Sequence, residues 1–344
     1  MKKICLVISK YLHNNEIFNV NSKLNRDGIF NKYIQLRKEF LKFNCELSTS
    51  DINSIETSDA VLYFDMPKEL PTRDKIDTSY LVLVESELIR PDNYQLKKHS
   101  YFKKIFTWHD GIVDDKKYYK LNFSHLFPSE INKELSNKKK LFTLIAGNKK
   151  SPIKSRDELY SKRVEAVRWF EKYHPEDFDL YGVGWGARRF EGPKLIRGLN
   201  RVPYLGSFYA ICTGQVYPSY QGMVDNKKGV MERYKFSICY ENVKNIPGYI
   251  TEKIFDSFFA GCVPIYWGAN NITDYIPATC FIDKRNFDTY EELYEYIVMI
   301  SDESYMQYLE NIEEFLCSQV SYQFTGKGFA EKVVSIISRG FDDN

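Results

Sequence analysis

The residues best able to do chemistry in this chain lie where an apolar stretch gives way to a helix. Thr251 can cap a helix that begins near Glu252, and apolar residues then recur on one face of that helix at Ile254, Phe255, Phe258 and Phe259. Such a helix start offers free backbone N–H groups and a positive dipole end, which bind an anion such as a diphosphate. Lys253 could add a full charge, and Glu252 could accept two ribose hydroxyls. The spacing fits a capped surface helix with a solvated Glu-Lys pair equally well.

Other polar groups form no recognisable metal site. The single Asp-x-Asp spacing, Asp177-Phe178-Asp179, opens a predicted strand. His109, beside Trp108 at a predicted strand end, could approach a substrate, but a hydrogen-bonded structural role is expected. The remaining histidines are isolated and support no ligand cluster: His13, His99, His125 and His174. No bound metal is therefore expected to be essential.

One glycine pattern resembles the dinucleotide fingerprint but lacks its context. Gly182, Gly184 and Ala187 satisfy GxGxxA after a predicted strand. Glu191-Gly192-Pro193 interrupts the helix that should follow, and no acidic residue ends a second strand about 20 positions later. A nicotinamide oxidoreductase is therefore disfavoured, and these glycines are interpreted as a flexible turn.

The composition indicates a soluble protein of two domains. The 344 residues exceed what one hydrophobic core usually supports, so two domains of roughly 150 residues are expected. The 48 basic and 46 acidic residues nearly cancel, which gives no field that suggests nucleic-acid or membrane binding. The lysine runs 138–140 and 149–150 are interpreted as solvated loops.

The same sequence suggests a cytoplasmic location. Met1–Ser9 is too short for a signal peptide and reads as a buried strand, and no apolar run reaches the about 18 residues of a membrane span. The odd number of scattered cysteines indicates reduced thiols: Cys5, Cys45, Cys212, Cys239, Cys262, Cys280 and Cys317. Peripheral membrane attachment stays open, although no basic or aromatic amphipathic tail after Phe329 supports attachment by a tail.

Short apolar runs alternate with helical patterns, which predicts an α/β fold of βαβ units. Strands are predicted at Lys3–Ser9, Glu46–Ser48, Ala60–Phe64, Tyr80–Val84, Lys104–Trp108, Leu141–Ala146, Asp179–Gly182, Lys235–Tyr240 and Val263–Trp267. Helices are predicted at Arg156–Tyr173, Tyr290–Ile300, Tyr305–Gln319 and Phe329–Ser338, and a further helix is expected to turn Ile29, Tyr33, Leu36, Phe40 and Phe43 toward the first sheet.

The chain thus reads as two successive doubly wound halves. Residues 127–140 are the best candidate for a linker, and the region 184–231, which has little periodicity, is expected to be a long irregular excursion. We expect an N-terminal domain over residues 1–136, a C-terminal domain over 137–320, and a final helix within 321–344 that packs back towards the N-terminal domain.

Three sequence elements carry a family resemblance. YKFSICYEN at 234–242, GYITEK at 248–253 and AGCVPIYWG at 260–268 resemble the signature region of glycosyltransferase family 10, the α-1,3/4-fucosyltransferases, with bacterial members most similar in pattern. The resemblance covers roughly residues 141–290, including the helix with Arg163 and the Phe281-Ile282-Asp283 segment, and it assigns Asp177-Phe178-Asp179 to structure. The first half matches by architecture and by the short element Val84-Glu85-Ser86-Glu87.

The resemblance implies a GT-B-like fold, in which two Rossmann-like domains with parallel sheets face a cleft. The C-terminal domain would bind the nucleotide sugar GDP-fucose, and the N-terminal domain would handle most of the acceptor. Its implied site residues are Arg163 and Lys253 on the diphosphate, Glu252 on the ribose, Asn242 and Tyr249 along the donor pocket, and Glu241 on the fucose or in support of the loop.

The implied reaction is displacement at the fucose anomeric carbon with inversion, which requires a base for the acceptor hydroxyl and stabilisation of the departing GDP. Glu85 fits the base because it ends the apolar run 81–84, where side chains enter the crevice outside a parallel sheet. Its alternative role is an ordinary carboxylate that caps the loop at Ser86. Glu87 is the nearest substitute and Asp110 a distant one.

The leading hypothesis is therefore a fucosyltransferase that acts on a glycan, with α-1,3 linkage to GlcNAc or Glc in a Gal-containing unit. No cofactor is expected to be required, although a divalent cation could aid product release by pairing with GDP. The alternatives are a GT-B transferase that uses another nucleotide sugar and a non-catalytic glycan-binding module. An oligosaccharide or glycoconjugate acceptor would meet the loops 11–27 and 108–127, and no nucleic-acid partner is expected. Oligomeric state is undetermined.

Overall fold

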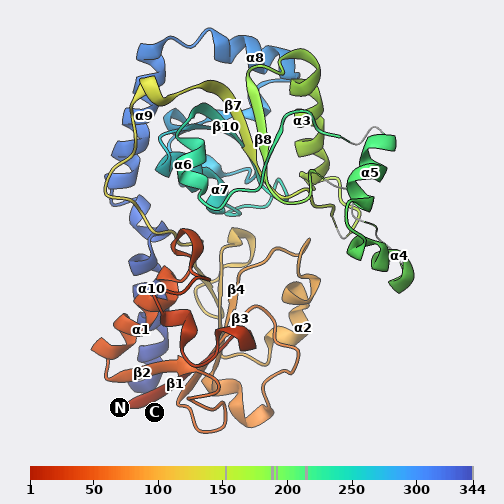
Figure 1. Ribbon diagram of the computed structural model, residues 1–344. Helices are drawn as coiled ribbons and strands as arrows, with labels where there is room; N and C mark the ends of the chain where they lie inside the picture. Colours follow the sequence, from red (N-terminus) through yellow and green to blue (C-terminus); the bar gives the residue numbers. More distant parts are fainter. Residues whose placement is uncertain (152, 187–189, 191–192, 214–215, 343–344) are drawn as a thin grey trace.

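Two parallel β-sheets of six strands each organise the chain (Figure 1). The structure is a computed structural model that describes residues 1–151, 153–186, 190, 193–213 and 216–342. The first sheet has the order β2-β1-β3-β4-β5-β6, and its strands are β1 (Lys2–Val7), β2 (Cys45–Thr49), β3 (Ala60–Phe64), β4 (Ser79–Leu83), β5 (Lys104–Thr107) and β6 (Tyr118–Lys120). The second has the order β12-β11-β10-β7-β8-β9, and its strands are β7 (Lys140–Ile145), β8 (Phe178–Tyr181), β9 (Tyr220–Gly222), β10 (Tyr234–Tyr240), β11 (Val263–Trp267) and β12 (Ile282–Asp283).

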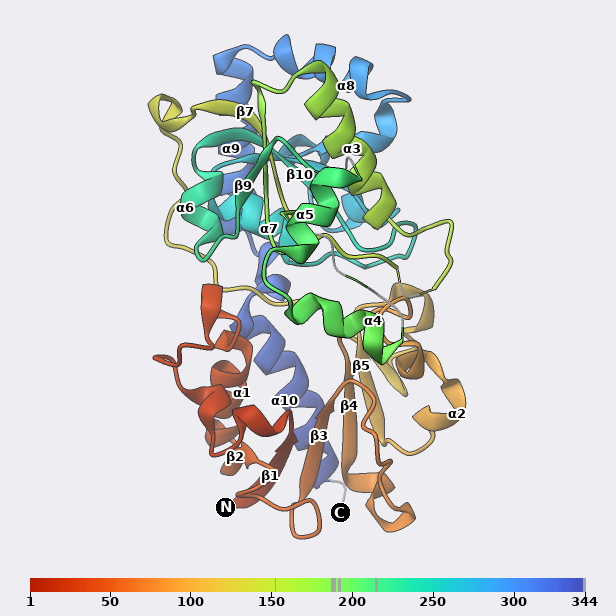
Figure 2. The ribbon, with the colours of Figure 1, turned by 45° about the vertical axis from the view of Figure 1, so that its right-hand side comes forward.

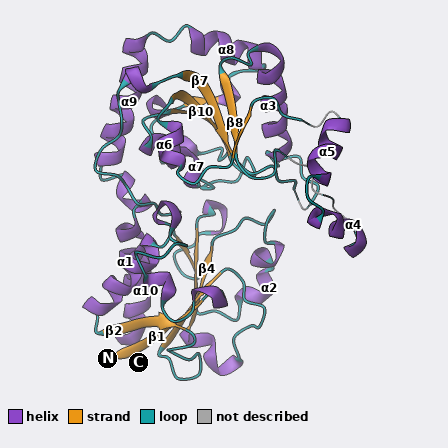
Figure 3. Ribbon diagram, in the orientation of Figure 1, coloured by secondary structure: helices purple, strands orange, loops and turns teal. Residues whose placement is uncertain are grey.

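Helices surround both sheets (Figure 3). They are α1 (Asn31–Lys42), α2 (Leu96–His99), α3 (Tyr160–Tyr173), α4 (Lys194–Gly198), α5 (Leu205–Cys212), α6 (Lys227–Met231), α7 (Glu252–Phe259), α8 (Tyr290–Val298), α9 (Asp302–Cys317) and α10 (Gly326–Asp342). In much of the chain strands alternate with amphipathic helices that cover the sheets, such as α1 between β1 and β2 and α7 between β10 and β11. None of the helices described has the length and apolar character that crossing a membrane requires.

The last helix returns to the half of the molecule built on the first sheet. Helix α10 packs along α1, and near its end the centroid of the Phe341 ring lies 4.1 Å from Lys2 Nζ of β1 (Figure 1). Its buried residues Phe329, Val333 and Ile337 share one core with Leu36 of α1 and Leu6 of β1. That core covers one face of the first sheet, so the N-terminal half consists of two segments far apart in the sequence.

The predicted elements agree with the structure to within a few residues, with four differences. Ile29 and Phe43 are exposed because α1 begins at Asn31 and ends at Lys42. Helix α3 begins at Tyr160, four residues later than expected. Strands β6 and β9 were not expected, since three residues are too few for a detectable alternation. The region 184–231, expected to be irregular, contains α4, α5, β9 and α6. The domain boundaries at residues 136 and 320 stay a prediction.

Direct contacts join the two halves. Trp108, which follows β5, packs against Tyr249 of the C-terminal half with ring centroids 4.7 Å apart. Asp110 accepts hydrogen bonds from Asn271 Nδ2 at 2.9 Å and from the Tyr275 hydroxyl at 2.7 Å, and it pairs with Lys120 at 2.5 Å. These contacts fix how the carboxyl ends of the two sheets face each other.

Candidate active site

A cavity of about 450 Å³ lies between the two halves. Glu85, just beyond β4, reaches it from the N-terminal half, and Asn242, just beyond β10, reaches it from the C-terminal half. Chain segments that follow parallel strands gather at one edge of a sheet, which is where α/β proteins bind ligands. The cavity also contains six of the seven residues that the sequence singled out: Glu85, Arg163, Asn242, Tyr249, Glu252 and Lys253.

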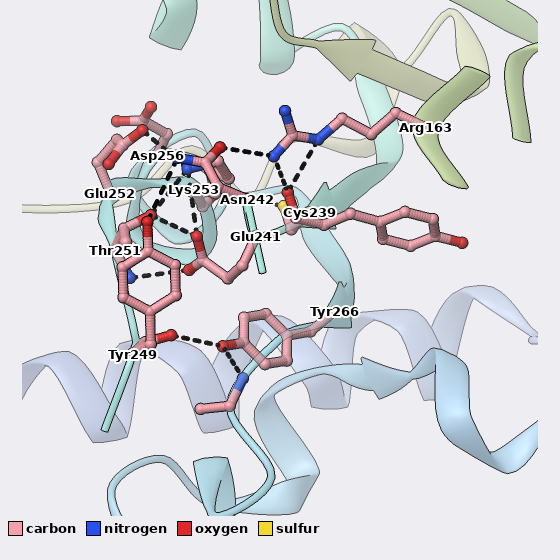
Figure 4. Close-up of polar contacts among 12 residues, drawn as sticks. Arg163, Cys239, Glu241, Asn242, Tyr249, Thr251, Glu252, Lys253, Asp256 and Tyr266 are labelled. Carbon is pink, nitrogen blue, oxygen red and sulfur yellow. Dashed lines mark hydrogen bonds and ion pairs between the residues drawn. The ribbon is translucent and has the colours of Figure 1, made fainter. Parts of the chain in front are cut away.

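The seventh residue, Glu241, does not line the cavity, and its carboxylate points toward Thr251 and Lys253 (Figure 4). Its fully buried carboxylate accepts hydrogen bonds from the Thr251 backbone N–H at 2.8 Å and from the Thr251 hydroxyl at 2.6 Å. Thr251 stands at the N-cap of α7 as expected, but its hydroxyl makes no capping bond; it donates to Glu241 and accepts from Lys253 Nζ. Glu241 therefore anchors the start of α7.

The first two residues of α7 form a charged group with Glu241 (Figure 4). Lys253 Nζ lies 3.2 Å from Glu241 Oε2 and 3.1 Å from Glu252 Oε1. Burial opposes the charged form of Lys253, but these two carboxylates outweigh it and raise the pKa of Lys253. Burial likewise opposes ionisation of Glu252, and the neighbouring lysines lower the pKa of its carboxyl. An ammonium and a half-exposed carboxylate thus stand side by side at the helix start.

Arg163 forms the opposite wall of this site. Its Nε and Nη2 donate to the Tyr240 carbonyl at 3.2 and 2.7 Å, and Nη2 also donates to Asn242 Oδ1 at 3.0 Å. Asn242 in turn donates to the Tyr249 hydroxyl at 3.3 Å. The guanidinium of Arg163 is buried and poorly hydrated, and this burial lowers the pKa of Arg163. An anion is therefore a favourable partner for it.

Glu85 lies in an unusual carboxylate environment. Asp65 Oδ1 accepts from the backbone N–H groups of Val84 and Glu85 at 2.7 and 3.0 Å and from Asn93 Nδ2 at 2.7 Å, which fixes the loop. Among the described residues, no group donates a hydrogen bond to the Glu85 carboxylate itself. Burial, followed by the charges of Asp65 and Glu252, raises the pKa of Glu85. The backbone at Glu85 is therefore held in place, and its carboxylate is a stronger base than that of an ordinary glutamate.

The two substitutes for Glu85 have other surroundings. Glu87 is exposed and is not among the residues that line the cavity. Asp110 is engaged in the contact between the halves. His109, next to it, accepts the Gly111 backbone N–H at its Nδ1 and stacks on Trp108, which agrees with a structural role.

Three charged cavity residues were missed by the sequence analysis: Lys149, Lys227 and Asp256. Lys227 and Asp256 pair at 2.7 Å, and burial raises the pKa of Asp256 to about 6. Asp256 lies one turn after Glu252 on α7, and this i, i+4 spacing could have revealed it. The interpretation of the lysine runs as solvated loops was wrong for Lys140, which lies in β7 and pairs with Asp179 at 2.9 Å. Lys149 is exposed in a loop as expected, and it also lines the cavity.

Two other expectations need adjustment. His174 is not isolated, since it lies with Glu176 and Asp177 in a group that could hold a metal ion, outside the lining of the cavity.

In the glycine pattern, Gly182 has φ +126° and a Cβ there would meet the Ala146 carbonyl oxygen at 2.1 Å, so the position requires glycine. Ala187, Glu191 and Gly192 of that pattern lie outside the described residues.

Comparisons with known proteins agree with this geometry. Residues 195–330 match the model of the C-terminal region of glycosyltransferase family 10 (fucosyltransferase). An alpha-(1,3)-fucosyltransferase FucT from Helicobacter pylori is 36% identical over 74 residues, which are 22% of this chain and only 15% of that protein. A crystal structure of an α1,3-fucosyltransferase with GDP-fucose superposes over 98% of this chain and 90% of that one, with a TM-score of 0.52 and 17% identity.

The fold is shared more widely. An α-glucosyltransferase in complex with UDP-glucose and DNA superposes over 98% of this chain and 99% of that one, with a TM-score of 0.59 and 11% identity. Such likeness, together with two parallel six-stranded sheets, shows the GT-B fold. The comparisons thereby confirm the family resemblance for residues 195–330, which match the C-terminal region of glycosyltransferase family 10 (fucosyltransferase).

Proposed function

We propose that this chain transfers L-fucose from GDP-fucose to a hydroxyl of a glycan acceptor with inversion of the anomeric configuration. The observation that carries the proposal is one cavity in which Glu85 of the N-terminal half faces Arg163 and Lys253 of the C-terminal half. The family match over residues 195–330 supports the donor. The α-1,3 linkage to GlcNAc or Glc in a Gal-containing unit is the finer part of the proposal.

The C-terminal half would hold the donor. Lys253 and Arg163 would neutralise the diphosphate, and the start of α7 would add its backbone N–H groups. Glu252, whose side chain is 48% exposed, is free to accept the two ribose hydroxyls. Asn242 and Tyr249 would line the pocket, and Glu241 would act through Thr251 as a positioning residue.

Glu85 would act as the general base. The acceptor oxygen attacks the anomeric carbon of fucose while its proton passes to the Glu85 carboxylate, and the bond from that carbon to the β-phosphate oxygen of GDP breaks. Negative charge then grows on the diphosphate, where Arg163 and Lys253 stabilise it. The raised pKa of Glu85 makes it the better proton acceptor.

No metal is needed for these steps. The four cationic side chains in the cavity, Lys149, Arg163, Lys227 and Lys253, supply positive charge that a divalent ion supplies elsewhere. A divalent cation would then stimulate turnover only by pairing with GDP as it leaves.

The substitution Glu85→Gln tests the base. We expect transfer to fall about 10²- to 10⁴-fold because the acceptor hydroxyl loses its proton acceptor, while the dissociation constant for GDP stays within about twofold. Transfer is measured with GDP-fucose and a panel of oligosaccharides, and GDP binding by calorimetry. Glu87→Gln is the matched control, since that carboxylate is exposed, and unchanged transfer in Glu85→Gln would remove Glu85 from the mechanism.

A nucleotide-sugar panel tests the donor and separates the alternatives. GDP-fucose should raise the melting temperature more than UDP-glucose does. Stabilisation by UDP-glucose alone would favour a GT-B transferase that uses another nucleotide sugar. UDP-glucose is included because the α-glucosyltransferase with the same fold was solved in complex with it. Glycan binding without any response to nucleotide would favour a non-catalytic module.

A further inference from the structure

Residues 194–213 form an arm that stands out from the body of the molecule. Helices α4 and α5, with the turn between them, project beside the C-terminal half (Figures 1 and 2). Eight large hydrophobic side chains described within residues 195–211 are exposed, among them Leu195 at 90%, Tyr204 at 85% and Phe208 at 65%. A surface this apolar on a soluble protein marks a contact with a partner.

The charge of the arm has a single sign. Lys194, Arg197 and Arg201 lie among the exposed apolar residues, and no aspartate or glutamate occurs from 193 to 213. None of the three cations forms an ion pair with a described residue. The whole chain, in contrast, balances 48 basic against 46 acidic residues. The arm is thus both apolar and basic on a protein that is otherwise nearly neutral.

The apolar face of a helix elsewhere in the molecule, α10, is covered. Helix α10 buries Phe329, Val333, Val334 and Ile337 against α1 and the first sheet. The arm has no comparable cover: in α5 only Ala210 is buried, while Phe208 and Ile211 are exposed.

We propose that the arm docks the protein onto a membrane surface that contains anionic lipids. Its apolar side chains would enter the boundary between headgroups and acyl chains, and its three cations would meet the lipid phosphates. A second copy of the chain fits less well, because a two-fold interface between arms would bring two patches of the same positive charge together. This inference does not depend on the donor or the reaction.

Vesicle flotation of the full chain tests the proposal. We expect binding to vesicles of phosphatidylcholine with phosphatidylglycerol, weaker binding to phosphatidylcholine alone, and a decrease with added salt. Arg197→Gln with Arg201→Gln should weaken binding roughly thirtyfold, since each lysine or arginine near the surface contributes about fivefold in affinity. Leu195→Gln with Phe208→Gln should abolish binding to both kinds of vesicle.

Two matched controls keep the test specific. Arg73→Gln with Lys97→Gln removes two exposed cations elsewhere, and Met223→Gln with Met299→Gln removes two exposed apolar side chains elsewhere. Both should bind vesicles as the unmodified chain does. The proposal is overturned if the unmodified chain does not float with anionic vesicles, if the arm variants float equally, or if light scattering shows a dimer that the arm variants dissociate.

Discussion

At the scale of single residues, three glutamates near one cavity differ in what their surroundings allow. Glu241 is fully buried and satisfied by Thr251, so it supports the backbone. Glu252 is half exposed beside Lys253, which keeps it ionised and available to hydroxyls. The Glu85 carboxylate receives no hydrogen bond from a described residue and has a raised pKa, which suits proton transfer. Environment, more than residue type, separates their roles.

The carboxylate of Asp65 should set the pH at which Glu85 works. Burial is the largest cause of the raised pKa of Glu85, and the charge of Asp65 is the next. Asp65→Asn removes that charge but keeps an oxygen to accept from Val84 and Glu85, and asparagine tolerates the φ of +61°. We expect the pKa of Glu85 to fall, so that the acid limb of kcat/KM moves to lower pH.

The control for this shift is Asp59→Asn, which removes a carboxylate bonded to the Lys3 backbone N–H, away from the cavity. Its pH profile should match that of the unmodified enzyme. An acid limb that stays in place in Asp65→Asn, with the fold retained by circular dichroism, would show that Glu85 does not control that limb.

At the scale of elements, the position of the start of α7 depends on Glu241, the residue that follows strand β10. Glu241 follows β10, and its two bonds to Thr251 place the first turn of α7 where Glu252 and Lys253 enter the cavity. The helix is eight residues long, too short to be stable by itself, so its position comes from these bonds and from the buried Ile254, Phe255 and Phe258.

Two matched substitutions distinguish a residue that holds the start of α7 in place from a residue that binds the donor. Glu241→Gln leaves Thr251 short of an acceptor and Lys253 without a buried partner, so we expect a loss of about 3 kcal/mol in unfolding free energy. Glu252→Gln should lower GDP affinity but change stability by less than about 1 kcal/mol, because its ion pair is half exposed. Urea unfolding and calorimetry measure both. Normal stability with lost GDP affinity in Glu241→Gln would indicate instead that Glu241 contacts the donor.

A feature could be predicted from the sequence when neighbouring residues determine it, and not when residues far apart in the chain do. Ala60–Phe64 and Val263–Trp267 were predicted with their observed bounds, because each is an apolar run with its own flanking polar residues. Lys227 and Asp256 were missed, since 29 positions separate them and only the fold brings their charges together. Lys149 is exposed in a loop as expected, but its place at the cavity was not predicted, because only the fold brings that loop there.

At the scale of the whole molecule, Asp110 makes the largest described set of side-chain hydrogen bonds at the junction of the two halves. Asp110 bonds Asn271 and Tyr275 across the junction and pairs with Lys120 within its own half. Burial opposes the charge of Asp110, but Lys120 and the two hydrogen bonds outweigh it and lower its pKa. Its stabilising effect is therefore present above the usual pKa of an aspartate and is lost as the pH falls through the lowered value.

Asp110→Ala should uncouple the halves. It leaves the Lys120 ammonium and two donors without their acceptor, which costs on the order of 3 kcal/mol. In calorimetry we expect the unmodified chain to melt in one transition that GDP raises, and the variant to melt in two, of which GDP raises only the one from the C-terminal half. Asp114→Ala is the control, because that exposed carboxylate bonds only its own turn at Lys116, Lys117 and Tyr118. If Asp110→Ala still melts in a single transition that GDP raises as a whole, the halves are held together by the Trp108–Tyr249 packing and not by this carboxylate.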